Sequence, residues 1–167
     1  MLRASIAFAT GLVTLFGWTA LAAADKNEKE EKQSGPVKWT ATFEPKSVKP
    51  GGEATLKVKA SIESGWHIYA VDKPTGVSKK TALKLAAAEK LTPDKEWKIP
   101  DPVRYEKADE ETYVYLDDAT FTRKVKVSDS AEKAIETTVT AEFMACNEEM
   151  CLPPKKVVVK ATLKVEK

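Results

Sequence analysis

The feature that most constrains this chain is an alternation of apolar and polar residues with a period of two. It is clearest over residues 54–62, where Ala54, Leu56 and Val58 alternate with polar neighbours. A period of two places successive side chains on opposite faces of a strand, so one face is expected to be buried and the other exposed. The pattern predicts strands over residues 37–43, 54–62, 66–70, 81–88, 121–127, 135–145 and 157–165.

Turn residues separate these predicted strands, and helical spacing is sustained nowhere. The segment Lys49-Pro50-Gly51-Gly52 is the predicted turn before residue 54. Other turn signals are Pro45, Pro74, Gly76, Pro93, Pro100 and Pro102. About seven strands with no interleaved helices favour an all-β fold, an immunoglobulin-like antiparallel β-sandwich, over a parallel α/β fold. The Cys…Trp…Cys spacing of antibody domains is absent.

The beginning of the chain has the form of an export signal. A single basic Arg3 precedes an uncharged run from Ala4 to Ala24, which ends in three alanines. Small residues at the end of such a run are typical of a signal-peptidase site, so residues 1–24 are predicted to be removed rather than retained as an anchor. We therefore expect a periplasmic or otherwise exported protein that is not held in a membrane after cleavage.

The remainder of the chain is predicted to form one domain. Residues 25–35 contain no apolar side chain and are expected to be a flexible charged leader, followed by the domain over residues 36–167. The formal net charge is +2, and lysines and glutamates are interspersed. Because nucleic-acid binders concentrate basic residues, this distribution argues against nucleic acid as a partner. We expect a monomer.

Any covalent chemistry must use Cys146 and Cys151, which are the only cysteines. They lie between the last two long predicted strands, so they flank a tight turn and can approach within disulfide distance. In an exported protein the pair can be oxidised. A structural disulfide is one interpretation. However, a ring of about six residues restrains the unfolded chain by only about 2 kcal/mol, and a small ring also suits a reducible disulfide.

Two further functions remain open. The chain could be an interaction module with a structural disulfide, or a Cu(I) carrier, since sulfur and imidazole ligands suit that ion. The donors for Cu(I) would be His67, Met144, Cys146, Met150 and Cys151. A hydrolase is disfavoured because His67 is the only histidine and no Gly-x-Ser-x-Gly motif occurs. Within its strand, His67 is expected to be half-exposed.

Three segments resemble the N-terminal domain of DsbD-type thiol:disulfide interchange proteins. The run Cys-Asn-Glu-Glu-Met-Cys-Leu-Pro-Pro from Cys146 resembles the cysteine motif of that family. Residues 65–69, Gly-Trp-His-Ile-Tyr, resemble a second signature, and residues 100–115 are similar to the loop that covers the cysteines. Full-length members continue into membrane-spanning and thioredoxin-like domains, so this chain is expected to be a stand-alone form that takes electrons from separate proteins.

The resemblance implies an immunoglobulin-like domain with a redox-active disulfide. Such a domain relays reducing equivalents from a thioredoxin-like donor to periplasmic protein disulfides, including those of disulfide isomerase and cytochrome c maturation proteins. It would act as a protein-disulfide reductase in cell redox homeostasis, with no cofactor and no metal. Cys151 would form mixed disulfides and Cys146 would resolve them. Residues beside or covering the pair would be His67, Tyr69, Glu111 and Tyr113.

Overall fold

The computed structural model describes residues 33–76, 78–108 and 110–166. The predicted signal peptide and most of the predicted leader lie outside these residues. The described chain forms twelve strands and contains no α-helix. All but one of the strand pairings are antiparallel. The predicted all-β, immunoglobulin-like sandwich is confirmed.

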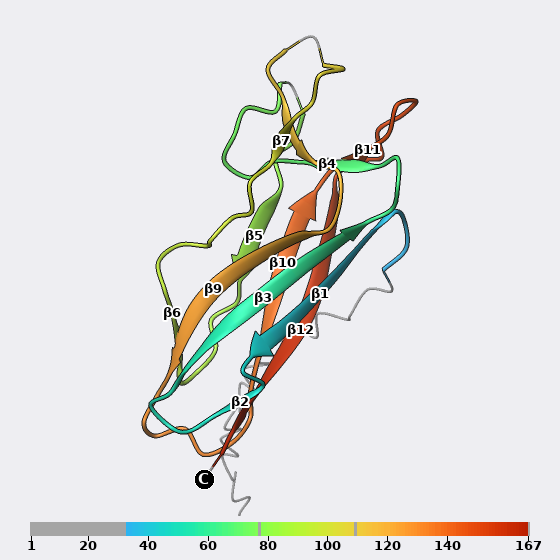
Figure 1. Ribbon diagram of the computed structural model, residues 1–167. Helices are drawn as coiled ribbons and strands as arrows, with labels where there is room; N and C mark the ends of the chain where they lie inside the picture. Colours follow the sequence, from blue (N-terminus) through green and yellow to red (C-terminus); the bar gives the residue numbers. More distant parts are fainter. Residues whose placement is uncertain (1–32, 77, 109, 167) are drawn as a thin grey trace, which may run out of the picture.

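Two four-stranded sheets form the body of the sandwich (Figure 1). The first has the order β1 (Val37–Glu44), β3 (Glu53–Ile62), β9 (Ala119–Val127) and β6 (Leu91–Pro93). The second has the order β2 (Ser47–Val48), β12 (Lys155–Val165), β10 (Ile135–Phe143) and β5 (Ala82–Leu85). Only β2 and β12 run parallel. The long strands carry the alternating pattern that the sequence shows, which gives each sheet an inner apolar face.

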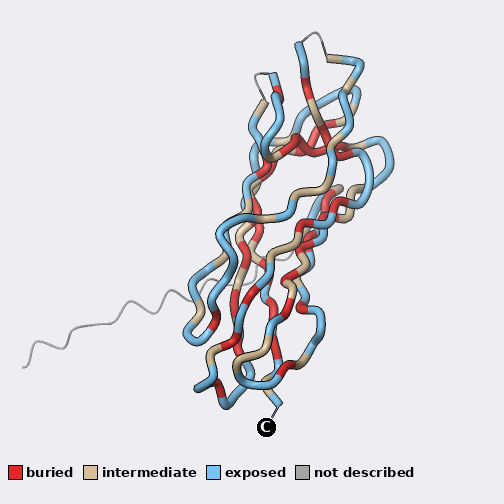
Figure 2. Tube along the Cα trace, turned by 60° about the vertical axis from the view of Figure 1, so that its left-hand side comes forward, coloured by how far each residue is buried: buried red, intermediate tan, exposed pale blue. Residues whose placement is uncertain are grey.

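A third, smaller sheet closes one end of the sandwich. Its order is β11 (Ala145–Cys146), β4 (His67–Tyr69), β8 (Tyr113–Tyr115) and β7 (Val103–Arg104). These strands lie at the end of the molecule opposite the C-terminus, at the top of Figure 1. In Figure 2 buried residues run through the length of the body and into this end. The cysteine pair therefore sits at the pole of the domain that is remote from the C-terminus.

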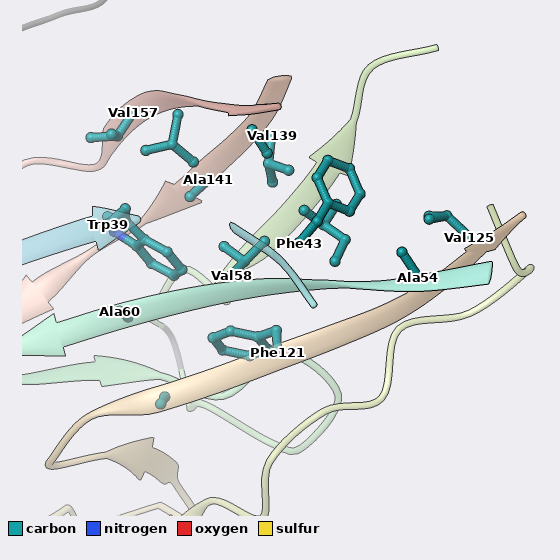
Figure 3. Packing of buried hydrophobic residues seen from close by; sticks show 14 of the residues in the cluster. Trp39, Phe43, Ala54, Val58, Ala60, Phe121, Val125, Val139, Ala141 and Val157 are labelled. Carbon is teal, nitrogen blue, oxygen red and sulfur yellow. The ribbon is translucent and has the colours of Figure 1, made fainter. Parts of the chain in front are cut away.

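Side chains from the two large sheets interdigitate to form the main core (Figure 3). Trp39 from β1 stacks on Phe121 from β9, with ring centroids 6.0 Å apart, and lies 5.4 Å from Phe143 of β10. Val58 and Phe121 face each other in the β3–β9 register, and both are fully buried. These aromatic contacts bridge the two layers, and Phe121 also meets Tyr115 of the closing sheet edge-on, with ring centroids 5.5 Å apart.

One turn depends on a glycine. Gly51 follows Pro50 with φ at +77°, a left-handed conformation that side chains with a Cβ rarely adopt. The turn is closed by the backbone amide of Gly52, which donates to the carbonyl of Lys49 over 2.9 Å. This geometry matches the predicted turn and starts β3 in the register that buries Ala54.

The structure contains more strands than the period-two pattern predicted. Five short strands, β2, β6, β7, β8 and β11, were not expected as separate elements. The predicted strand over 135–145 is divided at Met144 into β10 and β11, which belong to different sheets. A strand of two or three residues is too short to display a period, so these elements depend on tertiary pairing rather than on local pattern.

Candidate functional site

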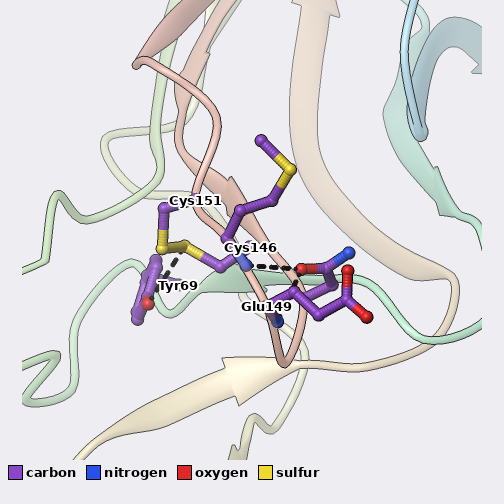
Figure 4. Close-up of a disulfide and its surroundings, with 6 residues drawn as sticks. Tyr69, Cys146, Glu149 and Cys151 are labelled. Carbon is purple, nitrogen blue, oxygen red and sulfur yellow. Dashed lines mark hydrogen bonds between the residues drawn. A yellow bond between two sulfur atoms is a disulfide. The ribbon is translucent and has the colours of Figure 1, made fainter.

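Cys146 and Cys151 form a disulfide across a short hairpin (Figure 4). Their Cα atoms are 4.0 Å apart, and the two residues are backbone partners in an isolated antiparallel bridge. The two sulfur-bearing residues differ in environment, because Cys146 is only 1% exposed while Cys151 is exposed. A thiol of another protein can therefore approach Cys151 far more easily than Cys146.

The disulfide closes a ring of backbone from Cys146 to Cys151, called here the cysteine ring. The turn inside this cysteine ring is held by Asn147. Its side-chain oxygen accepts hydrogen bonds from the backbone amides of Glu149, at 2.9 Å, and Met150, at 2.8 Å. The backbone amide of Asn147 also donates to the carbonyl of Met150. This is a local turn in which an asparagine side chain replaces a backbone acceptor. Asn147 was not among the residues predicted for the site, although asparagine after a strand is a recognised turn signal.

We expect Asn147→Ala to lower the free energy of unfolding of the oxidised protein by about 1 kcal/mol, because two backbone amides lose their acceptor. The measurement is the midpoint of urea denaturation. Asn147→Asp is the matched control, since it keeps an acceptor oxygen at the same place and should retain most of the stability. Equal losses in the two variants would show that the acceptor does not hold the turn.

The closing sheet has two faces with different contents. One face packs into the main core through Ala145, Ile68 and Tyr115, which are backbone partners across neighbouring strands. The other face carries Cys146 and Tyr69, which form a second buried cluster with Val114. The hydroxyl of Tyr69 donates to the Sγ atom of Cys146 over 3.3 Å, as Figure 4 shows. The buried sulfur thus has a hydrogen-bond donor already in place.

His67 lies on this same face, opposite Cys146 in the β4–β11 register. It is 3% exposed, so the expectation of a half-exposed residue is wrong. Aromatic rings cover it: its ring centroid lies 4.6 Å from that of Tyr105 and 5.4 Å from that of Tyr69. Burial lowers the pKa of His67 below its ordinary value, because an apolar environment disfavours the charged imidazole.

The loop between β7 and β8 contributes the cover over this face. Tyr105 packs against the second cluster as well as on His67, and its backbone amide donates to the carbonyl of Thr112. Lys107 of the same loop forms an ion pair with Glu148, which belongs to the cysteine ring. This hydrogen-bonded contact raises the pKa of Lys107 and lowers that of Glu148. Tyr105 was not among the residues predicted for the site, because no local pattern shows which aromatic side chain of a loop turns inward.

Of the residues expected to cover the pair, Glu111 and Tyr113 are paired with each other. The Tyr113 hydroxyl donates to a Glu111 carboxylate oxygen over 3.1 Å, and this bond raises the pKa of Tyr113. The ring of Tyr113 packs against the main core rather than in the second cluster. The structure therefore brings His67 and Tyr69 to the pair, and a covering role for Glu111 and Tyr113 stays a prediction.

The soft donors considered for Cu(I) are distributed unevenly around the disulfide. Met144 is half-buried and packs against the cluster that contains Cys146, whereas Met150 is 53% exposed on the ring. Within the described residues, no group of three or more His, Cys, Asp or Glu side chains is arranged to hold a metal ion.

In the part of the chain that the structure describes, no helix is long and apolar enough to cross a membrane.

The fold and the disulfide together define a class of protein. An immunoglobulin-like sandwich presents a disulfide at one pole, with Cys146 buried and Cys151 exposed, and this arrangement suits thiol–disulfide exchange. A family model described as the N-terminal domain of the thiol:disulfide interchange protein DsbD matches residues 33–163. The chain belongs to this family. A sequence comparison with curated proteins found no match.

Several solved structures are similar to the chain. The N-terminal periplasmic domain of ScsB from Proteus mirabilis is 14% identical with a TM-score of 0.47, and the match covers 73% of this chain. The chain spans 44% of the length of that ScsB chain. The N-terminal domain of DsbD from Neisseria meningitidis in the reduced form is 15% identical with a TM-score of 0.43, covering 78% of this chain and 90% of the other. The yeast GGA1 GAE domain is 13% identical with a TM-score of 0.45, covering 81% and 96% respectively.

Proposed function

We propose that this protein relays reducing equivalents between a thioredoxin-like donor and the disulfides of other exported proteins, using Cys146 and Cys151. The observation that carries the proposal is the asymmetry of the pair, in which Cys151 is exposed and Cys146 is buried against the Tyr69 hydroxyl. Membership of the DsbD N-terminal family supports this chemistry. The activity would be that of a protein-disulfide reductase.

The exchange proceeds through a mixed disulfide at Cys151. A donor thiolate attacks the Cys151 Sγ atom, the Cys146–Cys151 bond breaks, and Cys146 leaves as a thiolate that the Tyr69 hydroxyl stabilises. A second donor thiolate then attacks the donor sulfur of the mixed disulfide, which oxidises the donor and releases reduced Cys151. In the second half-reaction the Cys151 thiolate attacks an acceptor disulfide. Cys146 then attacks Cys151, the intramolecular bond re-forms and the acceptor thiol leaves.

The setting that we propose for this exchange is the periplasm. Residues 1–24 would direct export and be removed, residues 25–35 would form a leader, and the domain over residues 36–167 would act as a monomer. The donor would be a thioredoxin-like protein, and acceptors would include a disulfide isomerase and cytochrome c maturation proteins. The exposed ring around Cys151 supports direct contact with such partners.

The reduction potential of the purified protein tests this function. We expect a potential less negative than about −300 mV, because structural disulfides of exported proteins lie below that value and labile ones above it. The measurement is equilibration of the wild-type protein with thiol redox buffers, followed by alkylation of free thiols. A potential well below about −300 mV would indicate a structural disulfide and contradict the relay.

A further inference from the structure

One nitrogen beside the disulfide is buried without a partner. The Nε2 atom of His67 makes no hydrogen bond within the described chain, although the residue is only 3% exposed. A buried polar atom without a partner costs stability, so its presence needs a reason. The other side-chain atoms of this kind in the described residues belong to Trp39, Thr81 and Tyr115. Of the four, only His67 titrates near neutral pH.

Strand pairing places His67 beside the buried cysteine. His67 and Cys146 are direct partners between β4 and β11, so their side chains leave the sheet on the same face. The Cβ atoms of such partners lie about 4.5–5.5 Å apart in antiparallel sheets. The imidazole is therefore within reach of a thiol on Cys146, either directly or through one bridging water molecule. Tyr69, whose hydroxyl contacts the Cys146 sulfur, occupies the same face.

The surroundings of the imidazole favour its neutral form, which can accept a proton. The rings of Tyr69 and Tyr105 enclose it, and burial lowers its pKa, which favours the neutral imidazole. A hollow of about 380 Å³ adjoins it, and the charged groups that line this hollow are Lys107, Asp117 and Glu148. Lys107 and Glu148 are paired with each other, so their opposite charges offset one another in their effect on the imidazole.

We propose that His67 accepts the proton of the Cys146 thiol when Cys146 resolves a mixed disulfide held on Cys151. This inference rests on the relay proposed above. The proton passes from the Cys146 sulfur to the imidazole, and the resulting thiolate attacks the Cys151 Sγ atom. The Cys146–Cys151 bond forms as the bond from Cys151 to the partner sulfur breaks, and the partner leaves as a thiolate. The imidazolium then returns its proton to that leaving thiolate or to water.

The resolution step can be measured with glutathione as the probe. Reduced wild-type protein is converted to its Cys151–glutathione disulfide, held at acidic pH and then jumped to a series of higher pH values, and the release of glutathione is timed. We expect release from the wild type to rise with an apparent pKa below the value of about 8.5 for an ordinary thiol. In His67→Phe the profile should move to about 8.5, and release at neutral pH should be about tenfold slower.

Thr81→Val is the matched control for these measurements. It also removes a buried polar atom that has no partner, but one that cannot accept a proton near neutral pH. Its profile should coincide with that of the wild type. His67→Phe keeps an aromatic ring against Tyr105, so the cover over the pair should persist. Superimposable profiles for the wild type and His67→Phe would overturn the inference.

A second measurement on the wild type needs no variant. In NMR titrations the imidazole of His67 should have a higher pKa in the reduced protein than in the oxidised one, because a thiolate on Cys146 stabilises the imidazolium. Equal imidazole pKa values in the two states would also overturn the inference. If the titration shows the shift but Cys151 never accepts glutathione, the proton link stands and the relay fails. If glutathione exchanges normally and no shift occurs, only the role of His67 fails.

Discussion

Cys146→Ala is expected to convert the protein into a trap for its partners. In this variant Cys151 can still attack a disulfide, because it is the exposed member of the pair, but no second thiol is in reach to expel the partner. An intramolecular thiol reacts at a very high effective concentration, so its loss should lengthen the life of the mixed disulfide by at least about a hundredfold. The species to be measured is a covalent heterodimer on a non-reducing gel.

The test requires a defined partner sulfur. A thioredoxin-like protein that retains one active-site cysteine, activated as its thionitrobenzoate disulfide, provides one. With Cys146→Ala the heterodimer should accumulate, whereas the reduced wild type should pass through it and end as the Cys146–Cys151 disulfide. Cys151→Ala is the matched control and should yield little heterodimer, since Cys146 is only 1% exposed. Heterodimer formed equally by both variants would contradict the assigned roles.

The body of the sandwich could be predicted from the sequence because long strands display their period. Residues 54–62 bury Ala54, Leu56 and Val58 in β3, as their alternation with polar residues predicted. The glycine turn before β3 and the hairpin position of the two cysteines also follow from short-range chemistry. Each of these features is determined within about ten residues of chain, which is the range over which pattern and turn propensity operate.

The environment of the disulfide could not be predicted in the same way. The burial of His67 depends on Tyr105, which lies in a loop far along the chain and turns inward through tertiary packing. The ion pair of Lys107 with Glu148 also joins distant segments. Neither contact has a local signature, because each joins residues that are far apart in the sequence and one partner of each lies in the loop between β7 and β8. Glu111 hydrogen-bonds the Tyr113 hydroxyl, and its predicted covering role stays a prediction.

The largest expected loss of stability follows Phe121→Ala. Phe121 is fully buried, lies 6.0 Å from the ring of Trp39 and meets Tyr115 edge-on at 5.5 Å. Truncation of a buried phenylalanine removes its transfer free energy and leaves a cavity, which costs about 3–5 kcal/mol. A domain of this size is stable by only about 5–15 kcal/mol, so the urea midpoint of the oxidised protein should fall steeply.

Phe121 also supports the closing sheet, and a second variant separates this effect from simple destabilisation. Phe43 is likewise a buried core residue, but it contacts neither Tyr115 nor Trp39 through a ring pair. Phe43→Ala should lose a similar free energy of unfolding. Phe121 contacts Tyr115, which lies in β8, and β8 pairs with β4, the strand that bears Tyr69. Only Phe121→Ala should therefore also increase the rate at which dithiothreitol reduces the disulfide under native conditions. Equal reduction rates in the two variants would show that the body of the sandwich does not control access to the pair.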